Sequence, residues 1–447
     1  MKVMLVAGAR PNFAKVACIL DALDKFNQSS DRPIVPFLVH TGQHYDDQMS
    51  DAFFRDLAMA KPDVDLGVGS ASHAQQTAEI MRRFEPVLFQ ERPDVVLVVG
   101  DVNSTVACSL VASKAVYPCA VRNSERPGPL VAHVEAGLRS FDRSMPEEIN
   151  RVLTDALSDL LFITEKSAAE NLTREGIAKE KIYFVGNTMV DTLLKHREKA
   201  NDSKILCQLG LNGGPPLSSG RDSQNKQCRD YGILTLHRPS NVDGRETFQE
   251  ILESLAVVAK EIPIFFPVHP RTLNRIKEFG FERYFTSVAH GAWRMAHSAE
   301  LLALNSQPLT PVSRPQLSTL ASELPAPCSL LSLSSDSCSL PARIYCLPPL
   351  GYLDFLCLMS NARLVLTDSG GIQEETTVLG IPCVTLRENT ERPVTMTQGS
   401  NVLAGTKREE IIRHALGKLH DPVQPRTPEL WDGRAGERIV KILAKLA

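Results

Sequence analysis

Short runs of consecutive apolar residues recur along the chain, and each is followed by a turn and then by residues at helical spacing. A strand that is apolar on both faces is typical of a parallel sheet covered by helices on each side. The alternation of such strands with helices along the whole chain predicts an α/β fold, doubly wound. The nine clearest predicted strands are residues 3–7, 95–99, 130–134, 160–164, 182–185, 233–236, 264–268, 363–367 and 383–386.

Two domains explain this number of strands better than one. Nine or more parallel strands are many for a single open sheet, so we expect two Rossmann-like sheets with a hinge near Gly186 and Asn187. The predicted domains are residues 1–187 and residues 188–428. The length agrees with this division, because 447 residues correspond to two or three domains at about 100–200 residues each.

Two segments interrupt the alternation. Residues 195–227 are polar and rich in Gly, Ser and Asn, which predicts a flexible surface segment. Residues 301–340 contain 10 Ser, 11 Leu and 5 Pro but only three charged residues. Because this composition has neither a helical nor a strand period, we expect a disordered, low-complexity insertion at about 285–343 inside the second domain.

The composition excludes several classes of protein. The 49 Lys and Arg residues nearly balance the 52 Asp and Glu residues, which argues against a nucleic-acid-binding protein with a basic surface. No run approaches the roughly 18 uninterrupted apolar residues of a membrane span, and the amino terminus does not resemble a signal peptide. The 10 cysteines include no Cys-x-x-Cys pair, so we expect buried thiols and no metal site. These features predict a soluble, cytoplasmic protein.

Polar groups gather where the predicted strands end, and ligands bind at the carboxyl ends of strands in open α/β sheets. After the first strand, Arg10 precedes Pro11, which suits the first turn of a helix, and Lys15 follows one turn later. Both side chains would face the mouth of a cleft, where a diphosphate can bind. A solvated Arg and Lys at the start of a helix is an equally simple interpretation.

Three carboxylates occupy similar positions in the first domain. Asp101 follows the strand 95–99, Glu135 ends the strand 130–134, and Glu147 follows Pro146 at the start of a helix. Asp101 can instead cap its helix, and the helix dipole alone favours an acidic first turn at Glu147. A glutamate at a strand end and close to a glycine is hard to explain by core packing, so Glu135 points to chemistry.

The second domain carries a candidate anion site. The strand 363–367 leads through Asp368 into Ser-Gly-Gly and a helix, and bare N–H groups at a helix N-terminus bind anions that glycines allow to approach closely. A Gly-x-Gly-x-x-Gly motif after a strand and a Walker A motif are both missing, so neither a dehydrogenase nor a P-loop enzyme is supported. The candidate binding residues of this domain are His237, Arg271, Ser369, Gly370, Gly371 and Glu375.

These segments together resemble the non-hydrolysing UDP-N-acetylglucosamine 2-epimerases. Each motif alone is a modest signal, but nine in the family's order, over nearly all of residues 1–280 and 344–440, are specific. The resemblance implies a GT-B fold, with two Rossmann-like domains facing a central cleft and a helix at 429–447 that crosses back to the first domain. The motifs are GARPNFAK, TGQHYDDQM, VVGDVNST, HVEAGLRSFDRSMPEEINR, VGNTMVDTLL, LTLHRPSN, VHPR, LTDSGGIQEET and ENTERP.

The family's reaction interconverts UDP-GlcNAc and UDP-ManNAc. Because the C2 hydrogen of the sugar is not acidic, the family eliminates UDP to give a 2-acetamidoglucal and then adds UDP back. This scheme needs an acid/base group on each face of the sugar and retention of UDP, but no cofactor. Asp101, Glu135 and Glu147 match the family's acid/base candidates, and which of them removes the proton stays open.

The resemblance also implies binding roles and partners. It assigns the diphosphate to Arg10, His237, Ser369 and Gly370, the ribose to Glu375 and the sugar region to Lys15. Gln43 and His44 fall near the second, regulatory substrate site of bacterial members. The implied partner is a UDP-sugar, with no nucleic acid and no membrane. The implied assembly is a homodimer that supplies polysaccharide synthesis.

Several alternatives stay open at this point. The start Gly-Ala-Arg-Pro varies from the commoner Gly-Thr-Arg-Pro, and some relatives with this start act on further-modified UDP sugars. The other possible functions are those of a hydrolysing 2-epimerase, a GT-B glycosyltransferase and a nucleotide-sugar-binding protein without turnover. The intact acid/base and phosphate positions favour an active enzyme.

Overall fold

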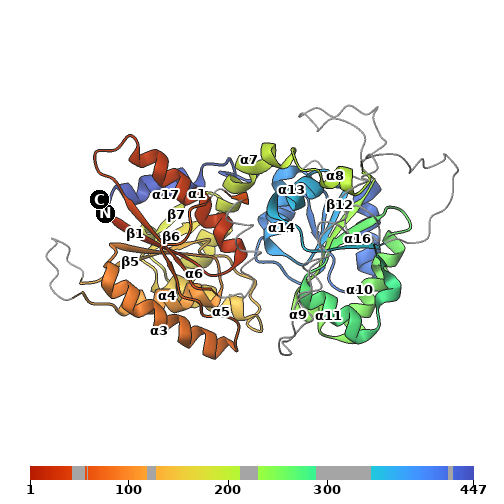
Figure 1. The fold of residues 1–447 in the computed structure, drawn as a ribbon, viewed down its shortest axis with the longest axis horizontal. Helices are drawn as coiled ribbons and strands as arrows, with labels where there is room; N and C mark the ends of the chain where they lie inside the picture. Colours follow the sequence, from red (N-terminus) through yellow and green to blue (C-terminus); the bar gives the residue numbers. More distant parts are fainter. Residues whose placement is uncertain are drawn as a thin grey trace, which may run out of the picture.

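The structure of the protein is a computed structural model, and it describes residues 1–42, 56–57, 59–117, 127–211, 230–287, 344–420 and 426–446. These residues form two α/β domains that lie side by side, each built on a parallel sheet with helices on both faces (Figure 1). The α/β class and the doubly wound arrangement expected from the sequence are therefore confirmed.

The first sheet has seven described strands in the order β3-β2-β1-β4-β5-β6-β7, and they pair in parallel. The apolar pattern did not predict β2, whose run is interrupted by Pro36, or β3, which has only two residues. The strands are β1 (Lys2–Ala7), β2 (Val35–His40), β3 (Val64–Asp65), β4 (Val95–Val99), β5 (Leu130–Val134), β6 (Leu160–Ile163) and β7 (Ile182–Phe184).

Alternate side chains of β1 pack against different helix layers. Val3 and Leu5 join the apolar cluster that includes α1, whereas Met4 and Val6 join the cluster with α3 and α4. On that second face, α3, α4 and α5 pack side by side. The helices of this domain are α1 (Arg10–Asn27), α3 (His73–Glu91), α4 (Asn103–Lys114), α5 (Pro146–Leu157), α6 (Lys166–Arg174) and the 3-10 turn η1 (Lys179–Lys181).

The second sheet also has seven described strands, in the order β10-β11-β9-β8-β12-β13-β14. Its strands are β8 (Gly232–Thr235), β9 (Ile264–Pro267), β10 (Thr286–Ser287), β11 (Ile344–Leu347), β12 (Leu364–Thr367), β13 (Cys383–Thr385) and β14 (Asn401–Leu403). Its helices are α9 (Pro239–Val242), α10 (Arg245–Val258), α11 (Pro270–Phe279), η2 (Glu282–Tyr284), α13 (Tyr352–Ser360), α14 (Gly370–Leu379), α15 (Val394–Thr397) and α16 (Arg408–His420).

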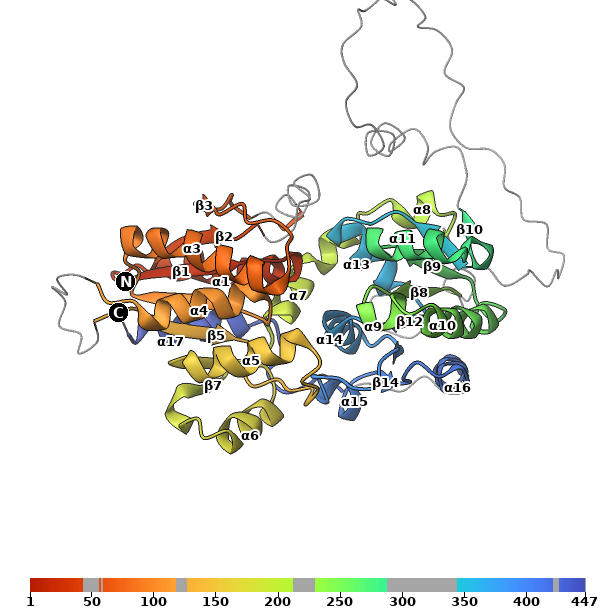
Figure 2. The same cartoon turned by 90° about the horizontal axis from the view of Figure 1, so that it is seen from below.

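Two segments connect the domains. The helix α7 (Thr188–Ala200) begins close to the expected hinge and packs against α1 of the first domain and against α13 and α14 of the second (Figure 2). The helix α17 (Ala435–Ala444) follows the second domain in sequence but packs on α1. The exact domain boundaries at 187 and 428 stay a prediction.

Trp431 anchors the returning carboxy-terminal segment. Its indole Nε1 donates a hydrogen bond of 3.0 Å to the carbonyl of Thr164, at the end of β6. Its ring is buried and packs with Val190 of α7 and Val394 of α15. This one side chain therefore contacts the first domain, the connecting helix and the second domain.

The prediction of a flexible surface segment at 195–227 is wrong for its first part. The helix α7 continues to Ala200, and the short helix α8 (Ile205–Gln208) buries Ile205 in the core. Polar composition misled the prediction because, within residues 195–208, only His196, Ala200 and Ile205 are buried and most other positions are exposed. Residues 212–229 lie outside the described residues.

The expected insertion lies largely outside the described residues. It was placed at about 285–343, of which the structure describes only the first residues, up to Ser287. Phe285 packs with Phe266 at a ring-centroid distance of 6.1 Å, and β10 pairs with β11. Residues 285–287, at the start of the expected insertion, therefore belong to the second domain. Within the described ranges, no helix has the length and apolar character that crossing a membrane requires.

Candidate active site

The carboxyl ends of β1 and β5 bring together a lysine and a glutamate. Lys15 Nζ lies 2.6 Å from Glu135 Oε2, and both side chains are buried. The solvated alternative for Lys15 is therefore wrong. Glu135 adopts a left-handed backbone, with φ of 71°, and its Oε1 has no hydrogen-bond partner among the described residues. A strained backbone and a buried polar atom without a partner are features of functional sites.

Asp101 lies at the carboxyl end of the neighbouring strand β4. Arg151 of α5 donates from Nε to Asp101 Oδ2 at 3.0 Å. Burial opposes the ionised form, but the positive charges of Arg151 and Lys15 outweigh it, so the pKa of Asp101 is lowered. The residue at the N-cap of α4 is Val102, and no side chain caps this helix. The capping interpretation of Asp101 is therefore wrong.

The two glutamates at the start of α5 differ in their surroundings. Glu148 is buried and accepts hydrogen bonds from the Ser140 amide, the Ser140 hydroxyl and the Phe141 amide, and it also pairs with Arg151. Glu147 is only half-buried, and no hydrogen bond or ion pair ties it to another described residue. The structure therefore brings Asp101 and Glu135 into one charged cluster but does not join Glu147 to it.

An arginine from the second domain completes this cluster. Arg392 Nη2 lies 3.8 Å from Glu135 Oε2, while its other nitrogens approach Glu374 at 2.8 Å and Glu391 at 2.6 Å. Burial opposes the charged guanidinium, but Glu374 and Glu391 outweigh it, and the pKa of Arg392 is raised. Arg387 also pairs with Glu391, at 2.9 Å. The domains thus meet through buried charges.

Two further contacts cross between the domains near this point. Asn389 donates a hydrogen bond of 3.1 Å to Asp142, and Arg387 Nη2 lies 3.8 Å from Met145 Sδ. None of the candidate residues expected from the sequence lies in 387–392, although this segment directly follows the predicted strand 383–386. The rule that found Asp101 and Glu135, polar residues after a strand, would also have found Arg387 and Arg392.

His237 of the second domain is held by a buried aspartate. Asp368, at the end of β12, accepts hydrogen bonds from the His237 and Arg238 amides at 2.9 and 2.8 Å, and its Oδ1 lies 3.0 Å from His237 Nδ1. Burial opposes protonation of His237, but Asp368 outweighs it, so the pKa of His237 is raised. The imidazole remains 44% exposed. This arrangement orients a partly accessible imidazole beside β12.

The start of α14 lies directly beside Arg392. A Cβ added to Gly370 would be 2.4 Å from Arg392 Nη1 and 2.7 Å from Glu391 Oε1, so only glycine permits this approach. Ser369 occupies the N-cap without using its side chain as a cap, and Gly371 follows in the first turn. The helix N-terminus, the guanidinium and His237 therefore form a positively polarised region.

Glu375 and Arg271 lie apart from the cluster of buried ion pairs. Glu375 is buried in α14, where burial and the neighbouring charge of Glu374 raise the pKa of its carboxyl to about 8. Arg271 begins the exposed side of α11 and pairs with Asp243 at 2.5 Å. The structure does not bring Arg271 into contact with the other candidate residues that it describes.

The structure describes no side chain for three of the predicted site residues. The backbone of Arg10 begins α1, at the carboxyl end of β1, but its side chain is outside the described part of the structure. Gln43 and His44, the predicted regulatory residues, lie outside the described residues altogether. Their roles stay predictions.

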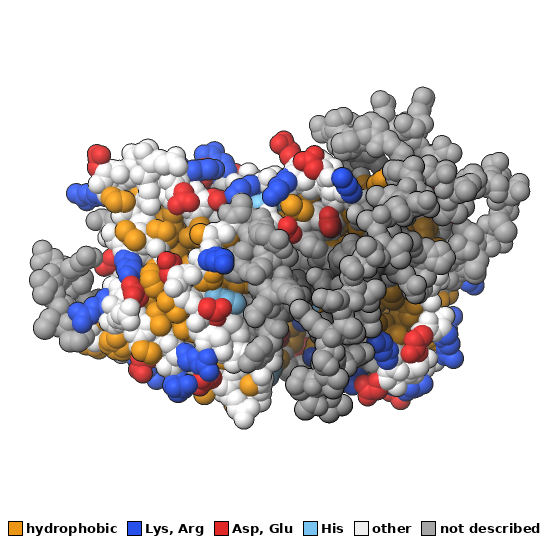
Figure 3. Space-filling view, in the orientation of Figure 1, with side chains coloured by type: hydrophobic (Ala, Val, Ile, Leu, Met, Phe, Trp, Pro, Cys, Tyr) orange, Lys and Arg blue, Asp and Glu red, His pale blue; other side chains and the backbone are white. Residues whose placement is uncertain are grey.

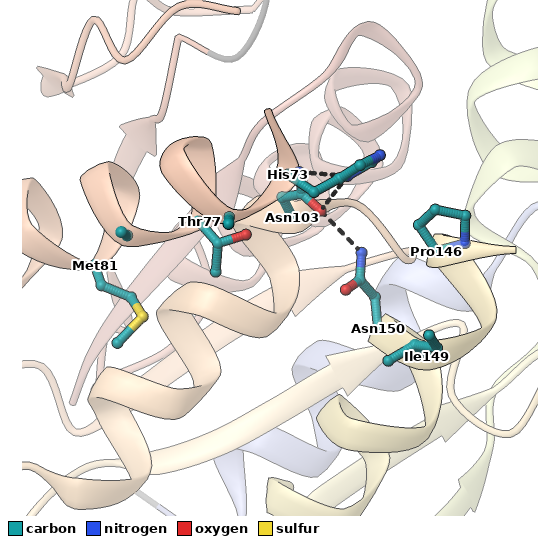
Figure 4. Close-up of a pocket in the computed structure, with 9 residues that line it drawn as sticks. His73, Thr77, Met81, Asn103, Pro146, Ile149 and Asn150 are labelled. Carbon is teal, nitrogen blue, oxygen red and sulfur yellow. Dashed lines mark hydrogen bonds between the residues drawn. The ribbon is translucent and has the colours of Figure 1, made fainter. Parts of the chain in front are cut away.

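An open hollow of about 470 Å³ adjoins the acidic side of the site, between α3 and α5 (Figure 4). Asn103 hydrogen-bonds both His73 and Asn150 across it, and Asn150 Nδ2 donates to the carbonyl of Asp101 at 3.0 Å. The walls are otherwise mostly apolar, with Met81 and Ile149 on opposite sides. Among the described residues, no group of His, Cys, Asp and Glu could hold a metal ion.

Comparisons with known proteins identify the family of the chain. The family described as UDP-N-acetylglucosamine 2-epimerase matches residues 28–292 and 313–444. A UDP-N-acetylglucosamine 2-epimerase of Methanocaldococcus jannaschii is 37% identical over 447 residues, which cover 99% of each chain. A UDP-2,3-diacetamido-2,3-dideoxy-D-glucuronate 2-epimerase of Pseudomonas aeruginosa is 33% identical over 449 residues, which cover 100% of each chain.

A solved structure shares the fold along the whole chain. The crystal structure of the Methanocaldococcus jannaschii UDP-GlcNAc 2-epimerase in complex with UDP-GlcNAc and UDP has a TM-score of 0.75, with 37% identity and 100% coverage of both chains. Two Rossmann-like domains with facing parallel sheets are the GT-B arrangement, so the predicted fold is confirmed.

Proposed function

The chain belongs to the UDP-N-acetylglucosamine 2-epimerase family, and we propose from this premise that it interconverts UDP-GlcNAc and UDP-ManNAc without hydrolysing them. It is an isomerase of the epimerase type. The proposal of a non-hydrolysing epimerase rests on one observation: two kinds of charged groups meet where the two domains face each other. Acid/base carboxylates come from the first domain, and a helix N-terminus with cationic side chains comes from the second.

In the proposed reaction, a carboxylate removes the C2 proton while UDP leaves from C1. Asp101 suits a general base because its lowered pKa keeps it ionised near neutral pH. Glu135 has an oxygen that the described protein leaves unbonded, and Lys15 holds the other oxygen in place. Glu147 is half-buried and has no ion pair to another described residue, and it is proposed as a further acid/base group beside the sugar. Protonation of the 2-acetamidoglucal on the opposite face, followed by addition of UDP, completes the epimerisation.

The second domain is proposed to hold the nucleotide. His237, Ser369, Gly370 and Gly371 surround the N-terminus of α14, which favours the diphosphate. Glu375 lies one turn into the same helix, where a ribose hydroxyl can reach it. Arg10 and Lys15 come from α1 on the opposite side of the junction. Arg271 is proposed as a further nucleotide-binding residue. We expect it to contribute less to UDP affinity, because Asp243 already pairs with its guanidinium.

A second candidate substrate comes from the Pseudomonas aeruginosa relative. Its name states that it acts on UDP-2,3-diacetamido-2,3-dideoxy-D-glucuronate, and it matches the whole chain at 33% identity. A carboxylated sugar of this kind adds a negative charge, which would need a cation beyond the diphosphate site. We favour the simpler sugar, since Arg387 and Arg392 are both already paired with glutamates.

One assay distinguishes the candidates. The purified protein is incubated with UDP-GlcNAc in D₂O, and the products are separated and examined by proton NMR. UDP-ManNAc with deuterium at C2 supports the proposal, whereas free ManNAc and UDP would identify a hydrolysing enzyme. A parallel incubation with UDP-2,3-diacetamido-2,3-dideoxy-D-glucuronate tests the second substrate. No reaction with either would contradict both proposals.

A homodimer and a role in supplying glycan synthesis belong to the same proposal. The helix α5 buries polar residues, while Ile149, Val152 and Leu153 are 40–48% exposed. Apolar side chains gather on this face of the first domain (Figure 3). A second copy covering such a face would explain the inverted pattern of α5. Light scattering that gives the mass of a single chain would contradict the homodimer.

A further inference from the structure

A buried charged network lies beneath the acidic half of the site. His133 of β5 is completely buried, and its ring is held at both ends. Its Nδ1 lies 2.6 Å from Asp155 Oδ1, and its Nε2 lies 2.8 Å from the carbonyl oxygen of Gly100. Asp155 comes from α5, so this imidazole connects three neighbouring elements, β4, β5 and α5.

The partners of the ring determine its protonation. A carboxylate and a carbonyl oxygen are both acceptors, so both ring nitrogens must carry hydrogen for both bonds to form. Arg139 also pairs with Asp155, at 2.7 Å, and with Glu175, at 2.6 Å. The positive charges of the imidazolium and the guanidinium are therefore balanced by two carboxylates. Burial opposes ionisation of Asp155, but His133 and Arg139 outweigh it, and the pKa of Asp155 is lowered. Two cations and two anions thus form a compensated cluster.

This cluster reaches the two turns that carry the proposed acid/base groups. The Gly100 carbonyl immediately precedes Asp101 in the chain. The second oxygen of Asp155 accepts a hydrogen bond of 3.0 Å from the Gly137 amide, two residues after Glu135. Glu135 needs such support, because its left-handed φ of 71° is unfavourable for a residue with a side chain.

We propose that His133 is a positioning residue that sets the placement of Asp101 relative to Glu135, through the Gly100 carbonyl and through Asp155. The inference rests on the proposed function, since it assumes that these carboxylates act on the sugar. His133 itself is completely buried, so we expect it to act on the carboxylates and not on the substrate directly. Its contribution therefore belongs to turnover and not to nucleotide binding.

Two substitutions separate the two hydrogen bonds of the ring. In His133→Gln, the amide nitrogen reaches the position of Nε2 and keeps the bond to Gly100. In His133→Asn, the shorter amide keeps the bond to Asp155 and loses Gly100. Both variants lose the positive charge, so they form a matched pair. We expect kcat of the asparagine variant to be at least ~10-fold below that of the glutamine variant, because small misplacements of reacting groups lower rates strongly. KM and the Kd for UDP should stay near wild type in both.

A stability control accompanies the pair. Leu88→Ala removes a buried side chain of α3 in the same domain, so it lowers the melting temperature without touching either turn. Its kcat, measured well below melting, should stay near wild type. Equal kcat values for the glutamine and asparagine variants would overturn the inference, and so would a kcat loss in Leu88→Ala as large as theirs.

Two measurements test the network independently of turnover. The ¹⁵N shifts of His133 in the wild-type protein should show both ring nitrogens protonated, and a neutral ring would overturn the inference. Amide exchange at Gly137 should be faster in His133→Gln, which loses Asp155, than in His133→Asn. If the wild type fails to convert UDP-GlcNAc, the proposed function falls. In that case only the ¹⁵N shifts and the amide exchange test the hydrogen bonds of His133. Unchanged exchange at Gly137 in the glutamine variant would contradict the proposed bond through Asp155.

Discussion

Individual buried charges decide the chemistry that the first domain can offer. Lys15 and Glu135 form an ion pair in which both partners are almost fully removed from water. Such a pair contributes little to stability compared with well-packed apolar side chains, because the desolvation of both charges offsets their attraction. Its presence at the junction of two domains therefore fits a functional purpose better than a structural one.

Amide substitutions test the three carboxylates. We expect Asp101→Asn, Glu135→Gln and Glu147→Gln each to lower kcat by at least ~10²-fold, the usual scale for acid–base catalysis, while the Kd for UDP changes modestly. Steady-state kinetics and UDP titration measure the two effects. Glu170→Gln, on the exposed surface of α6, serves as the control. Near wild-type turnover in both glutamine variants, Glu135→Gln and Glu147→Gln, would show that the assignment is mistaken.

The residues proposed to bind the diphosphate should affect affinity more than turnover. His237→Ala removes a partly exposed imidazole whose pKa is raised by Asp368, and Ser369→Ala removes a hydroxyl at the start of α14. Calorimetric titration with UDP should show a Kd raised roughly tenfold in each, as expected when one charge-assisted hydrogen bond is lost. Arg271→Ala should change the Kd less. Unaltered UDP binding in the His237 and Ser369 variants would remove them from the site.

The buried carboxyl of Glu375 predicts a specific dependence of stability on pH. Its pKa is raised from 4.5 to about 8, so the folded protein holds a proton that the unfolded chain releases. Its contribution is fully present below about pH 4.5 and is lost as the pH rises toward 8. Between pH 5 and 8, the melting temperature of Glu375→Gln should therefore fall less steeply than that of the wild type. Parallel curves for the two proteins would contradict the raised pKa.

At the scale of residues, the sequence identified the acidic half of the site better than its cationic half. Asp101 and Glu135 stand directly after apolar strands, so the topology alone brings them to one edge of a sheet. The contact of Arg392 with Glu135 joins positions far apart in the chain and depends on how two separate domains face each other. No local pattern in the sequence predicts how far Arg392 lies from Glu135. The burial of Lys15 has the same cause, since residues from both domains cover the junction.

At the scale of elements, the predicted strands are mostly those buried on both faces, with the partly buried edge strand β7 as an exception. The run 95–99 is apolar throughout, and residues 364–366 are the apolar centre of the predicted strand 363–367; the structure contains β4 and β12 there. The edge strands β3, β10 and β14 have two or three residues each, too few for any period to appear. The helix α5 also shows a limit of pattern reasoning, because its buried face is the polar one.

Two glycines in helices give a matched test of how α17 docks. A Cβ on Gly436 would lie 2.7 Å from the carbonyl oxygen of Cys18 in α1, whereas a Cβ on Gly417 of α16 would meet nothing within 4 Å. Gly436→Ala should therefore destabilise the protein by about 1–3 kcal/mol through overpacking. Gly417→Ala should stabilise it by up to about 1 kcal/mol, because alanine favours the helix. Chemical denaturation measures both, and a neutral Gly436→Ala would mean that α17 is loosely packed.

At the scale of the whole molecule, the described part of the chain accommodates the long Ser- and Leu-rich segment between two paired strands. Ser287 pairs with Cys346, two residues beyond the start of β11 at Ile344. At about 3.3 Å per residue and about 4.8 Å between strands, Ser287 and Ile344 are roughly 8 Å apart. The cost of closing a loop grows slowly with its length, so a long segment between near ends is compatible with the fold.

Replacement of residues 288–343 by a Gly/Ser linker of about eight residues tests this interpretation. The linker spans the gap with enough length to reverse direction. We expect the variant to melt cooperatively, to retain UDP-GlcNAc 2-epimerase activity and to be more soluble, since a nearly uncharged Leu-rich segment is removed. A control linker that replaces residues 282–343 also removes Tyr284 and Phe285, which are partly buried and pack against the core, and should lower the melting temperature. Loss of the cooperative transition in the shorter deletion would show that the segment is structural.

The position of Trp431 gives the protein an optical signal of its own. The chain has two tryptophans, Trp293 and Trp431, and the first lies within residues 288–343. In the linker variant, all indole fluorescence would come from one ring whose Nε1–H is bonded to the first domain while its face touches α7 and α15. A movement of either domain changes the polarity around that ring, and with it the emission wavelength. Stopped-flow mixing with UDP could therefore time the motion of the domains without any attached dye.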